Sequence, residues 1–496
     1  MIMAQEQAIL KAREVFNTMV AVVGGAAGQP KPLHEAERRL WDLGLAMMRQ
    51  MLEGYVAGFG QGDLGPTLEH KGRSWRRLDQ PHTRRYVSVF GPLQIDRRVY
   101  GTRETQKHEM VPLDAMLSLP EGDFSYLLQQ WDQGFCVQNS YSQSRQSVQQ
   151  ILGIGQSVRS LEHMSRAMAA DADPFLEAQA LPPAEQEGEV LVVTADGKGV
   201  PMCRVDGEGA PHGRLSKGQK KQKKREACVG AVYSVDRFER TAEDVMDEMS
   251  RQQKQAQRPR PQHKRLRAEL TRPDEQGREV RGKQRTFAWL AEQVAARNPG
   301  GEKPVVCLMD GAAALWAMAA AYLNGVTCVL DLLHVMEYIW KAAHCFHPEA
   351  SVQAHRFASE RLKRILEGDV GRVVGGLRQM RTRAGKRLSK AKRQTLETVI
   401  GYLDRNRDYM RYDAYLAAGY PIASGVVEGA CRHLVADRME LSGMRWWIPG
   451  AQAMLHLRAI HLNGDWDDFQ RYRIEQATNR LYPDRNRVID RWKRAA

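Results

Sequence analysis

The sequence predicts an α/β fold: a mixed sheet, an all-helical insertion in it, and a mainly helical region before it. Two observations lead to this prediction. Apolar, β-branched runs such as Val190–Ala195 and Val305–Met309 alternate with helical patterns in the middle of the chain. The residues from 333 to 420 carry helical patterns alone. We therefore expect one sheet whose chain is interrupted by a helical segment.

Length and charge limit the classes of function. The chain has 496 residues, enough for roughly two to four domains. Hydrophobic residues make up 43% of it, so it can bury a sizeable core. The 73 Lys and Arg residues exceed the 59 Asp and Glu residues, which gives a formal net charge of +14. This excess favours a polyanionic partner.

The seven cysteines argue against a disulfide scaffold or a zinc ribbon, because their number is odd and no CxxC occurs. We expect free thiols in a reducing cytosol. The N-terminus lacks the pattern of a signal peptide, and no run of about 18 apolar residues predicts a membrane span.

Residues 1–110 are predicted to form an α+β region with a basic hairpin. Apolar residues recur at helical spacing from His34 to Tyr55, and alternation around Gly91-Pro92 predicts a hairpin over Tyr86–Tyr100. Four arginines, at 84, 85, 97 and 98, make the hairpin basic. Either they form a solvated face or they contact the DNA backbone.

Residues 111–180 are predicted to form a helical region and a linker. Helices over Ser142–Leu152 and Gln156–Met168 meet at Gly153-Ile154-Gly155, which fits a helix-turn-helix. Arg159 and Arg166 belong to the polar face of the second helix, from which they could contact DNA. A plain helical hairpin has the same pattern and remains the alternative.

Residues 181–332 and 421–445 are predicted to form the sheet and its helices. Three strands come first, followed by a helix, a strand, a helix and a strand, which is the order of an RNase H-like sheet. The strands are expected at 190–195, 200–205, 227–235, 305–309 and 326–330, and the helices at 286–297 and 312–323. The polar stretch from 240 to 282 is expected to be irregular or partly helical. Residues 333–420 form the helical insertion, and residues 446–496 a basic C-terminal tail with one short helix.

Two strand patterns end in an aspartate followed by glycine, Asp196-Gly197 and Asp310-Gly311. We expect a turn at Asp196, and we expect the glycines to allow a ligand or another backbone to approach. Two Mg²⁺ ions about 4 Å apart can stabilise the attacking and leaving oxygens of a phosphodiester, and Mg²⁺ prefers carboxylate ligands. The pattern therefore predicts a metal site that needs a third acid from a later helix.

A strongly basic segment, residues 214–225, follows the first aspartate. We expect it to form a hairpin loop that holds nucleic acid near Asp196, with a flexible solvated loop as the alternative. Its candidate DNA-binding residues are Lys220, Lys221, Lys223, Lys224 and Arg225.

Four segments together resemble a DDE-type transposase of bacterial insertion sequences, of the ISKra group, with Mutator-like transposases as distant relatives. The segments are VVTADGKGV (192–200), VVCLMDG (305–311), CVLDLLHVMEYIWKAA (328–343) and YPIASGVVEGACRHLVADRMELSGMRWW (420–447). The resemblance covers the second half of the chain strongly and residues 34–170 more loosely.

The resemblance implies a retroviral-integrase-like RNase H fold with a helical insertion before the last catalytic helix. Asp196, Asp310 and Glu428 would be the three catalytic acids and the ligands of two Mg²⁺ ions, for which Mn²⁺ could substitute. Asp331 and His334 match the C/D-x-x-H motif that follows the second acid in such families. Asp331 also ends a predicted strand and remains an alternative second acid, and Glu337 remains a rival for the third.

Further residues near these motifs are candidates for contact with DNA. Lys198, Arg432 and His433 flank the acids and could meet phosphates, although Arg432 could instead pair with Glu428 one turn away. Trp446 and Trp447 could stack on an unpaired base or belong to the core.

The expected function is transposition of an insertion sequence. The expected partners are the terminal inverted repeats of the element and target DNA, both double-stranded, bound by a homo-oligomer in the bacterial cytoplasm, at the nucleoid. One alternative is a catalytically silent or domesticated transposase that only binds DNA. Another is an RNase H-like nuclease without strand transfer.

Overall fold

The structure is a computed structural model that describes residues 2–25, 28, 30–70, 73–101, 110–203, 224–250, 258–273 and 276–495. The candidate DNA-binding residues Lys220, Lys221 and Lys223 lie outside the described residues. The chain divides into two compact units. One comprises Met1–Phe175 and Trp466–Ala496, and the other comprises Leu176–Asp465.

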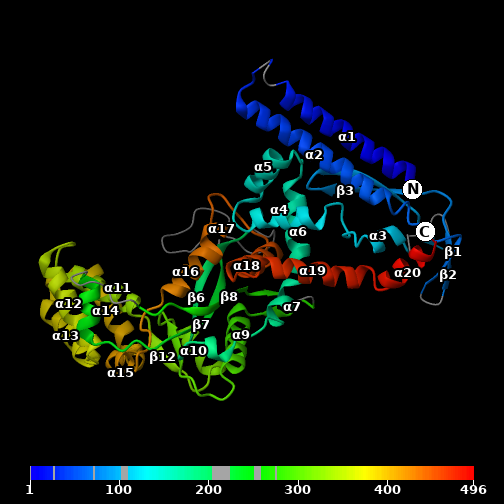
Figure 1. The fold of residues 1–496 in the computed structure, drawn as a ribbon. Coiled ribbons are helices and arrows are strands. Elements are labelled where there is room, and N and C mark those ends of the chain that lie inside the picture. The colour runs from blue at the N-terminus through cyan, green and yellow to red at the C-terminus, as the bar shows by residue number, and fades with distance from the viewer. Residues whose placement is uncertain are drawn as a thin grey trace, which may run out of the picture. The chain divides into compact units, whose positions relative to one another are not determined.

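The first unit begins with a helical hairpin of α1 (Ile2–Gly24) and α2 (Leu33–Ala57). The two helices approach closely at Gly54, where a Cβ atom would lie 3.4 Å from the Cβ of Ala8. Short strands and further helices complete the unit (Figure 1). They are β1 (Thr67–His70), β2 (Arg73–Arg77), β3 (His82–Ser88), β4 (Gly91–Arg97), β5 (Tyr100–Gly101), α3 (Pro112–Met116), α4 (Tyr126–Cys136), α5 (Tyr141–Leu152), α6 (Val158–Ala169), α7 (Ala172–Glu177, at the unit boundary), α19 (Trp466–Leu481) and α20 (Arg485–Ala495).

The predicted hairpin around Gly91-Pro92 is confirmed as the antiparallel pair β3–β4. Two of its arginines, however, are not a solvated face. Arg84 and Arg97 both form ion pairs with Asp114, and their side chains are only 10% and 14% exposed. They therefore hold the hairpin against α3 and do not present a basic surface.

The two helices predicted on either side of Gly153-Ile154-Gly155 are confirmed as α5 and α6. Gly153 ends α5 in a left-handed conformation with φ of 69°, which glycine adopts at no steric cost. Ser140 and Ser157 cap α5 and α6 through their hydroxyl groups. The polar face of α6 is exposed and includes Arg159 and Arg166.

The second unit contains a five-stranded mixed sheet in the order β12-β11-β6-β7-β8. Its strands are β6 (Val190–Pro201), β7 (Lys224–Val235), β8 (Gln262–Leu270), β11 (Val305–Met309) and β12 (Thr327–Leu330). Strand β11 is parallel to both neighbours, whereas β7 is antiparallel to β6 and to β8. The predicted α/β class is therefore confirmed.

Strand β6 corrects the prediction of a turn at Asp196. The strand continues through Asp196 to Pro201, and it pairs with β7 along its whole length. Gly197 and Gly199 make room for β7 side chains, because a Cβ at these positions would lie 2.8 Å from Glu226 Oε1 and 3.0 Å from Lys224 Cδ. The glycines thus serve strand pairing, and the two strands expected at 190–195 and 200–205 are one.

Strand β8 lies in the stretch for which no strand was predicted. Two of its charged residues are buried. Arg267 and Glu269 are 3% and 0% exposed and form an ion pair at 2.9 Å. Arg272 and His456 also contact the Glu269 carboxylate. A strand that buries charges in pairs does not show the apolar alternation on which the sequence analysis relied.

Helices cover the sheet and form the insertion (Figure 1). The predicted helices at 286–297 and 312–323 are confirmed as α9 and α10, and those of the insertion as α11 to α14, followed by the short α15. The helices of this unit are α8 (Ala242–Ser250), α9 (Gly282–Arg297), α10 (Ala313–Tyr322), α11 (Leu332–Phe346), α12 (Val352–Leu366), α13 (Val370–Ala384), α14 (Lys390–Arg405), α15 (Tyr412–Ala417), α16 (Gly425–Ala430), α17 (Asp437–Met439) and α18 (Ile448–Leu462). A π-helical stretch, Cys431–Ala436, joins α16 to α17.

The stretch from 446 to 496, expected as a basic tail with one short helix, forms α18, α19 and α20. Helix α18 is almost entirely buried, from Ala451 to Ile460, and packs against β8. Its polar residues face partners inside the unit; Gln452, for example, accepts the backbone N–H of Leu270. Among the described residues, no helix has the length and apolar character that crossing a membrane requires.

Candidate functional site

The register of the parallel strands brings three aspartates to one edge of the sheet. Leu308 of β11 lies opposite Thr194 of β6, and Met309 lies opposite Leu330 of β12. Continued by one or two residues, this register sets Asp310 beside both Asp196 and Asp331. Parallel strands end at the same edge, so residues that follow them meet there.

Asp310 is held by the turn that follows β11. Gly311 has φ of +88°, and a Cβ there would lie 2.7 Å from Leu330 Cδ1, so the turn requires glycine. One carboxylate oxygen, Oδ1, accepts the backbone N–H of Ala312 at 2.8 Å. The Asp310 carbonyl accepts the hydroxyl of Tyr402 at 2.7 Å. The Asp310 carboxylate is therefore held in position by the hydrogen bond to Oδ1.

Asp331 has a different environment. It is 2% exposed, and each carboxylate oxygen accepts a backbone N–H, from Leu333 at 2.8 Å and from Ser424 at 2.9 Å. The first bond caps α11, and the second ties the start of α11 to the start of α16. Both oxygens are thus used to hold helices together, which favours a structural role over a catalytic one.

Glu428 reaches this edge from α16. Ser424 caps the helix by accepting the N–H of Val427, and the Glu428 side chain is about half exposed. Its Oε1 atom lies 4.0 Å from Nε2 of His334 on α11. The third predicted acid and the predicted motif histidine are therefore neighbours, although they are separated by the whole insertion.

The acids of this edge act on one another electrostatically. Burial raises the pKa of Asp310, and the charge of Asp196 raises it further. Burial also raises the pKa of Glu428, to which the charges of Asp331, Glu337 and Asp196 add. Carboxylates that disfavour each other's ionisation in this way are typical of sites that gain from a bound cation.

The donor set fits Mg²⁺ or Mn²⁺, because it consists of carboxylate oxygens from rigid elements. No three of these acidic side chains, within the described part of the chain, bring their oxygen atoms within 4.8 Å of one another. The ligands of one Mg²⁺ ion, each about 2.1 Å from the metal, would have to be closer than that. A pair of ions about 4 Å apart suits the wider spread.

Cys431 is a member of this site that the sequence analysis did not identify. Its Sγ atom lies 3.4 Å from Oδ2 of Asp196, to which the thiol donates a hydrogen bond. Burial, and then the charge of Asp196, raise the pKa of this thiol, so it remains a neutral donor. Cys431 follows Glu428 by three residues, and residues at this spacing lie on the same face of a helix. The spacing alone could therefore have identified Cys431 as a neighbour of the site.

The candidate cations near Asp196 are paired within the protein. Lys198 lies 3.7 Å from Glu440, and Lys224 forms an ion pair with the same glutamate. Arg225 donates to the carbonyl oxygen of Thr271 at 2.9 Å. These residues line the strands beside the site, but each already has a partner.

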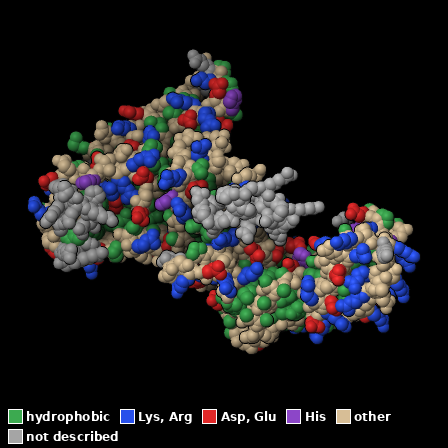
Figure 2. Space-filling view, turned by 180° about the vertical axis from the view of Figure 1, so that it is seen from behind, with side chains coloured by type: hydrophobic (Ala, Val, Ile, Leu, Met, Phe, Trp, Pro, Cys, Tyr) green, Lys and Arg blue, Asp and Glu red, His purple; other side chains and the backbone are tan. Residues whose placement is uncertain are grey.

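Arg432 and His433 project from the π-helical stretch and are largely exposed. Both pair with Asp437, at 3.5 Å and 2.9 Å. The alternative that Arg432 pairs with Glu428 has no support in this arrangement. Figure 2 shows that Lys and Arg side chains are scattered among acidic ones over the face it draws.

Trp446 belongs to the core and is not exposed for stacking on a base. It is 6% exposed, and its indole N–H donates to the carbonyl oxygen of Met439. Its backbone also pairs with Pro201 and Cys203 at the end of β6. Trp447, by contrast, is 59% exposed and stays available to a ligand.

Comparison of the chain with protein-family models and with curated proteins finds no match.

Proposed function

We propose that this protein is a DDE-type DNA transposase, of the kind that bacterial insertion sequences of the ISKra group encode. The observation that carries the proposal is the meeting of Asp196, Asp310 and Glu428 at one edge of the sheet, from two parallel strands and a later helix. The four sequence segments that resemble this family contain these acids and the elements that hold them.

The strand order supports an RNase H-like fold for the catalytic unit. Numbered along the chain, the five strands lie in the order fifth, fourth, first, second, third, and the second strand is antiparallel to its neighbours. The first acid is on the first strand, and the second acid follows the fourth. The insertion α11–α15 comes between the last strand and the helix with the third acid.

In the proposed reaction, water attacks the phosphodiester at the end of the element, the bond from phosphorus to the 3′ oxygen breaks, and a 3′-OH is released. That hydroxyl then attacks a target phosphodiester and displaces the 3′ oxygen of the target strand. Bound Mg²⁺ would supply charge stabilisation at the attacking and leaving oxygens. Asp196, Asp310 and Glu428 would hold the ions, and Tyr402 and Gly311 fix the position of Asp310.

A homo-oligomer on DNA is part of this proposal. Large apolar side chains of α1, among them Phe16, Val20 and Val23, are more than half exposed. They offer a surface through which two copies could associate. Light scattering with and without DNA would measure the number of copies, and the expected place of action is the bacterial cytoplasm, where the DNA lies.

The test uses purified protein, MgCl₂ and labelled duplexes that carry the inverted repeats flanking the gene. Asp196→Asn, Asp310→Asn and Glu428→Gln should each reduce strand cleavage by at least about 1,000-fold, because the charge stabilisation is lost. End binding should stay within about threefold. Glu360→Gln, on the exposed face of α12, is the control and should cleave normally.

A duplex with a pre-cut 3′-OH end separates a transposase from a nuclease. A transposase joins this end to target DNA, whereas a nuclease only degrades it. Cleavage that persists in any of the three variants would remove that residue from the catalytic set. Absence of both cleavage and joining by the unsubstituted protein would contradict the proposal.

A further inference from the structure

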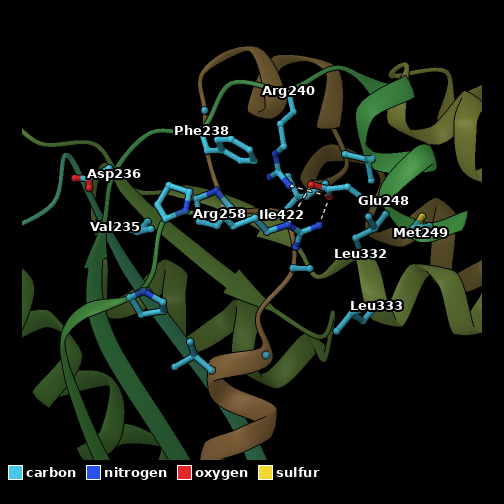
Figure 3. A pocket seen from close by; sticks show the side chains of 18 of the residues that line it. Val235, Asp236, Phe238, Arg240, Glu248, Met249, Arg258, Leu332, Leu333 and Ile422 are labelled. Carbon is cyan, nitrogen blue, oxygen red and sulfur yellow. Dashed lines mark hydrogen bonds and ion pairs between the residues drawn. The ribbon is translucent and has the colours of Figure 1, made fainter. Parts of the chain in front are cut away.

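A cavity of about 500 Å³ lies in the second unit, between the end of β7, α8, and the first turns of α11 and α16 (Figure 3). Most of its wall is apolar, with Phe238, Met249, Leu333, Met336 and Ile422 among the lining residues. Its size is within the range of sites that enclose small organic ligands.

Four charged side chains line the same cavity, Arg240, Arg258, Glu248 and Asp236, and their formal charges balance. Arg240 and Arg258 both point toward Glu248 (Figure 3). Arg258 hydrogen-bonds this carboxylate through two nitrogens, whereas Arg240 only approaches it at 4.0 Å. Asp236 accepts a hydrogen bond from the amide of Gln262 at 3.2 Å and lies apart from this group (Figure 3), so the two guanidinium groups share the one carboxylate of Glu248.

Arg240 is the unusual member of the group. Its side chain is only 10% exposed, and no described residue accepts a hydrogen bond from its buried Nε. A buried guanidinium nitrogen without an acceptor is costly, and an acceptor from a ligand would remove that cost. Its neighbour Phe238, 5.2 Å away, holds an aromatic ring beside it.

The combination of features indicates the class of ligand. Two guanidinium groups that share one carboxylate suit a phosphate, which Arg binds through two hydrogen bonds, and an aromatic and aliphatic wall suits a planar base. We propose that this cavity binds a nucleotide, with the phosphate on Arg240 and Arg258 and the base among the apolar side chains.

The cavity lies next to the elements that carry the acids. Leu332 and Leu333 directly follow Asp331, and Gly425 and Val426 belong to the helix of Glu428. Tyr233 in the wall pairs with Val192, four residues before Asp196, so at about 3.3 Å per residue the cavity is about 13 Å from that acid. This distance is about four base steps of duplex DNA.

A nucleotide could therefore come from two sources: a free nucleotide in solution, or a nucleotide turned out of the bound DNA end. The second source depends on the function proposed above, and the first does not. In both cases the ligand would pack against the first turn of α16 and thereby against the helix of Glu428.

The test fills the cavity by substitution. A Cβ at Gly425 would meet no atom within 4 Å, so Gly425→Leu places a side chain in open space at the cavity wall. Gly425→Ala is the small-residue control. Gly450→Leu is the matched control, because it also adds a side chain in open space in the first turn of a helix, α18.

The first arm measures free ligand by fluorescence anisotropy of etheno-AMP and of ethenoadenosine. If the source is free nucleotide, Gly425→Leu should weaken etheno-AMP binding at least tenfold, and both controls should stay within twofold. Arg240→Met should weaken etheno-AMP at least tenfold and ethenoadenosine less than threefold, because only the former has a phosphate.

The second arm measures the emission of 2-aminopurine placed at successive positions of a DNA end. If the source is DNA, emission should rise at one position with the unsubstituted protein and with Gly425→Ala, and not with Gly425→Leu. No response to Gly425→Leu in either arm would overturn the proposal. An effect on etheno-AMP in a protein that cleaves no DNA would retain the nucleotide site and reject the transposase, so the two proposals fail separately.

Discussion

The thiol of Cys431 donates a hydrogen bond to Oδ2 of Asp196 across 3.4 Å, and Cys431 directly follows α16, the helix that carries Glu428. The first and third candidate acids are thereby linked by one side chain. Cys431 is also the first residue of the π-helical stretch, a feature that is frequent at functional sites. We infer that the widened turn sets the distance between Glu428 and the strand of Asp196.

Removal of this thiol should reduce cleavage without removing it. A hydrogen bond of this kind contributes about 1 kcal/mol, so Cys431→Ala should lower the rate of strand cleavage about fivefold. Cys431→Ser keeps a donor and should stay within about twofold of the unsubstituted protein. Cleavage rates at saturating MgCl₂ measure both variants.

Cys345→Ala serves as the control for loss of a buried thiol. The Cys345 thiol donates to the carbonyl oxygen of Lys341, away from the three acids. A full rate for Cys431→Ala, or an equal loss for Cys345→Ala, would show that the bond to Asp196 has no specific role.

Asp310 and Asp331 should respond in opposite ways to the same change. Asp331→Asn should lower the free energy of unfolding by about 3 kcal/mol, because an amide can accept only one of the two backbone N–H groups. Asp310→Asn should leave the stability unchanged or raise it in EDTA, since Asn still accepts the N–H of Ala312 and the repulsion from Asp196 is gone. Urea unfolding measures both.

The DNA cleavage activities of the two variants should also differ. Asp310→Asn should be stable and inactive, whereas Asp331→Asn should cleave DNA measurably at temperatures where it is folded. The reverse outcome, a stable and inactive Asp331→Asn with an active Asp310→Asn, would make Asp331 the second acid.

Asp132 should make the first unit less stable as the pH rises. This residue of α4 is fully buried, and its burial raises the pKa to about 7 despite two hydrogen bonds from Gln156. A carboxyl whose pKa is raised on folding stabilises the fold below its unfolded pKa, near 4, and this stability is lost as the pH rises through about 7. The loss corresponds to about 4 kcal/mol.

Asp132→Asn should remove this dependence. The buried Oε1 of Gln156 has no hydrogen-bond partner among the described residues, and the new amide can donate to it. The variant should therefore be more stable than the unsubstituted protein at pH 8 and similar at pH 4, by urea unfolding followed by hydrogen exchange of α4. The exposed Glu162→Gln is the control, and equal curves for Asp132→Asn and the unsubstituted protein would contradict the prediction.

Arg159 and Arg166 should contribute to binding of DNA ends through phosphates. Both are exposed on α6, whose partly buried side packs against α4 and α5. Each Arg→Ala change should reduce the slope of log K against log salt concentration by about 1. Arg356→Ala, on the exposed face of α12, should leave the slope unchanged. A slope that is the same in all three variants would place the DNA elsewhere.

The sequence was sufficient where apolar patterns alone decide the structure. Val305–Met309 and the helices of the insertion are recognisable because their buried faces are apolar, and Asp310 is conspicuous because a required glycine follows it. It was insufficient where polar groups are buried in pairs. Strand β8 was missed for this reason, since Arg267 and Glu269 satisfy each other inside the unit.

Contacts between distant segments were also beyond the sequence analysis. Asp196 was expected in a turn, yet it lies within a strand, because pairing with β7 extends the strand by five residues beyond it. Asp331 and Asp310 both end a predicted strand, and the hydrogen bond that Asp331 accepts from the backbone of Ser424, 93 residues away, helps to distinguish them. Such differences arise from packing, which local residue patterns do not encode.

The bond between Asp331 and Ser424 also bears on how this chain can change over evolutionary time. It joins the points where the insertion leaves the rest of the second unit and returns to it, as does the bond from the Leu332 N–H to the Ile422 carbonyl. Once the two ends are fixed, each doubling of the length between them costs only about 0.6 kcal/mol. The insertion could therefore be lengthened, shortened or replaced during evolution, while Asp196, Asp310 and Glu428 would keep their relative positions.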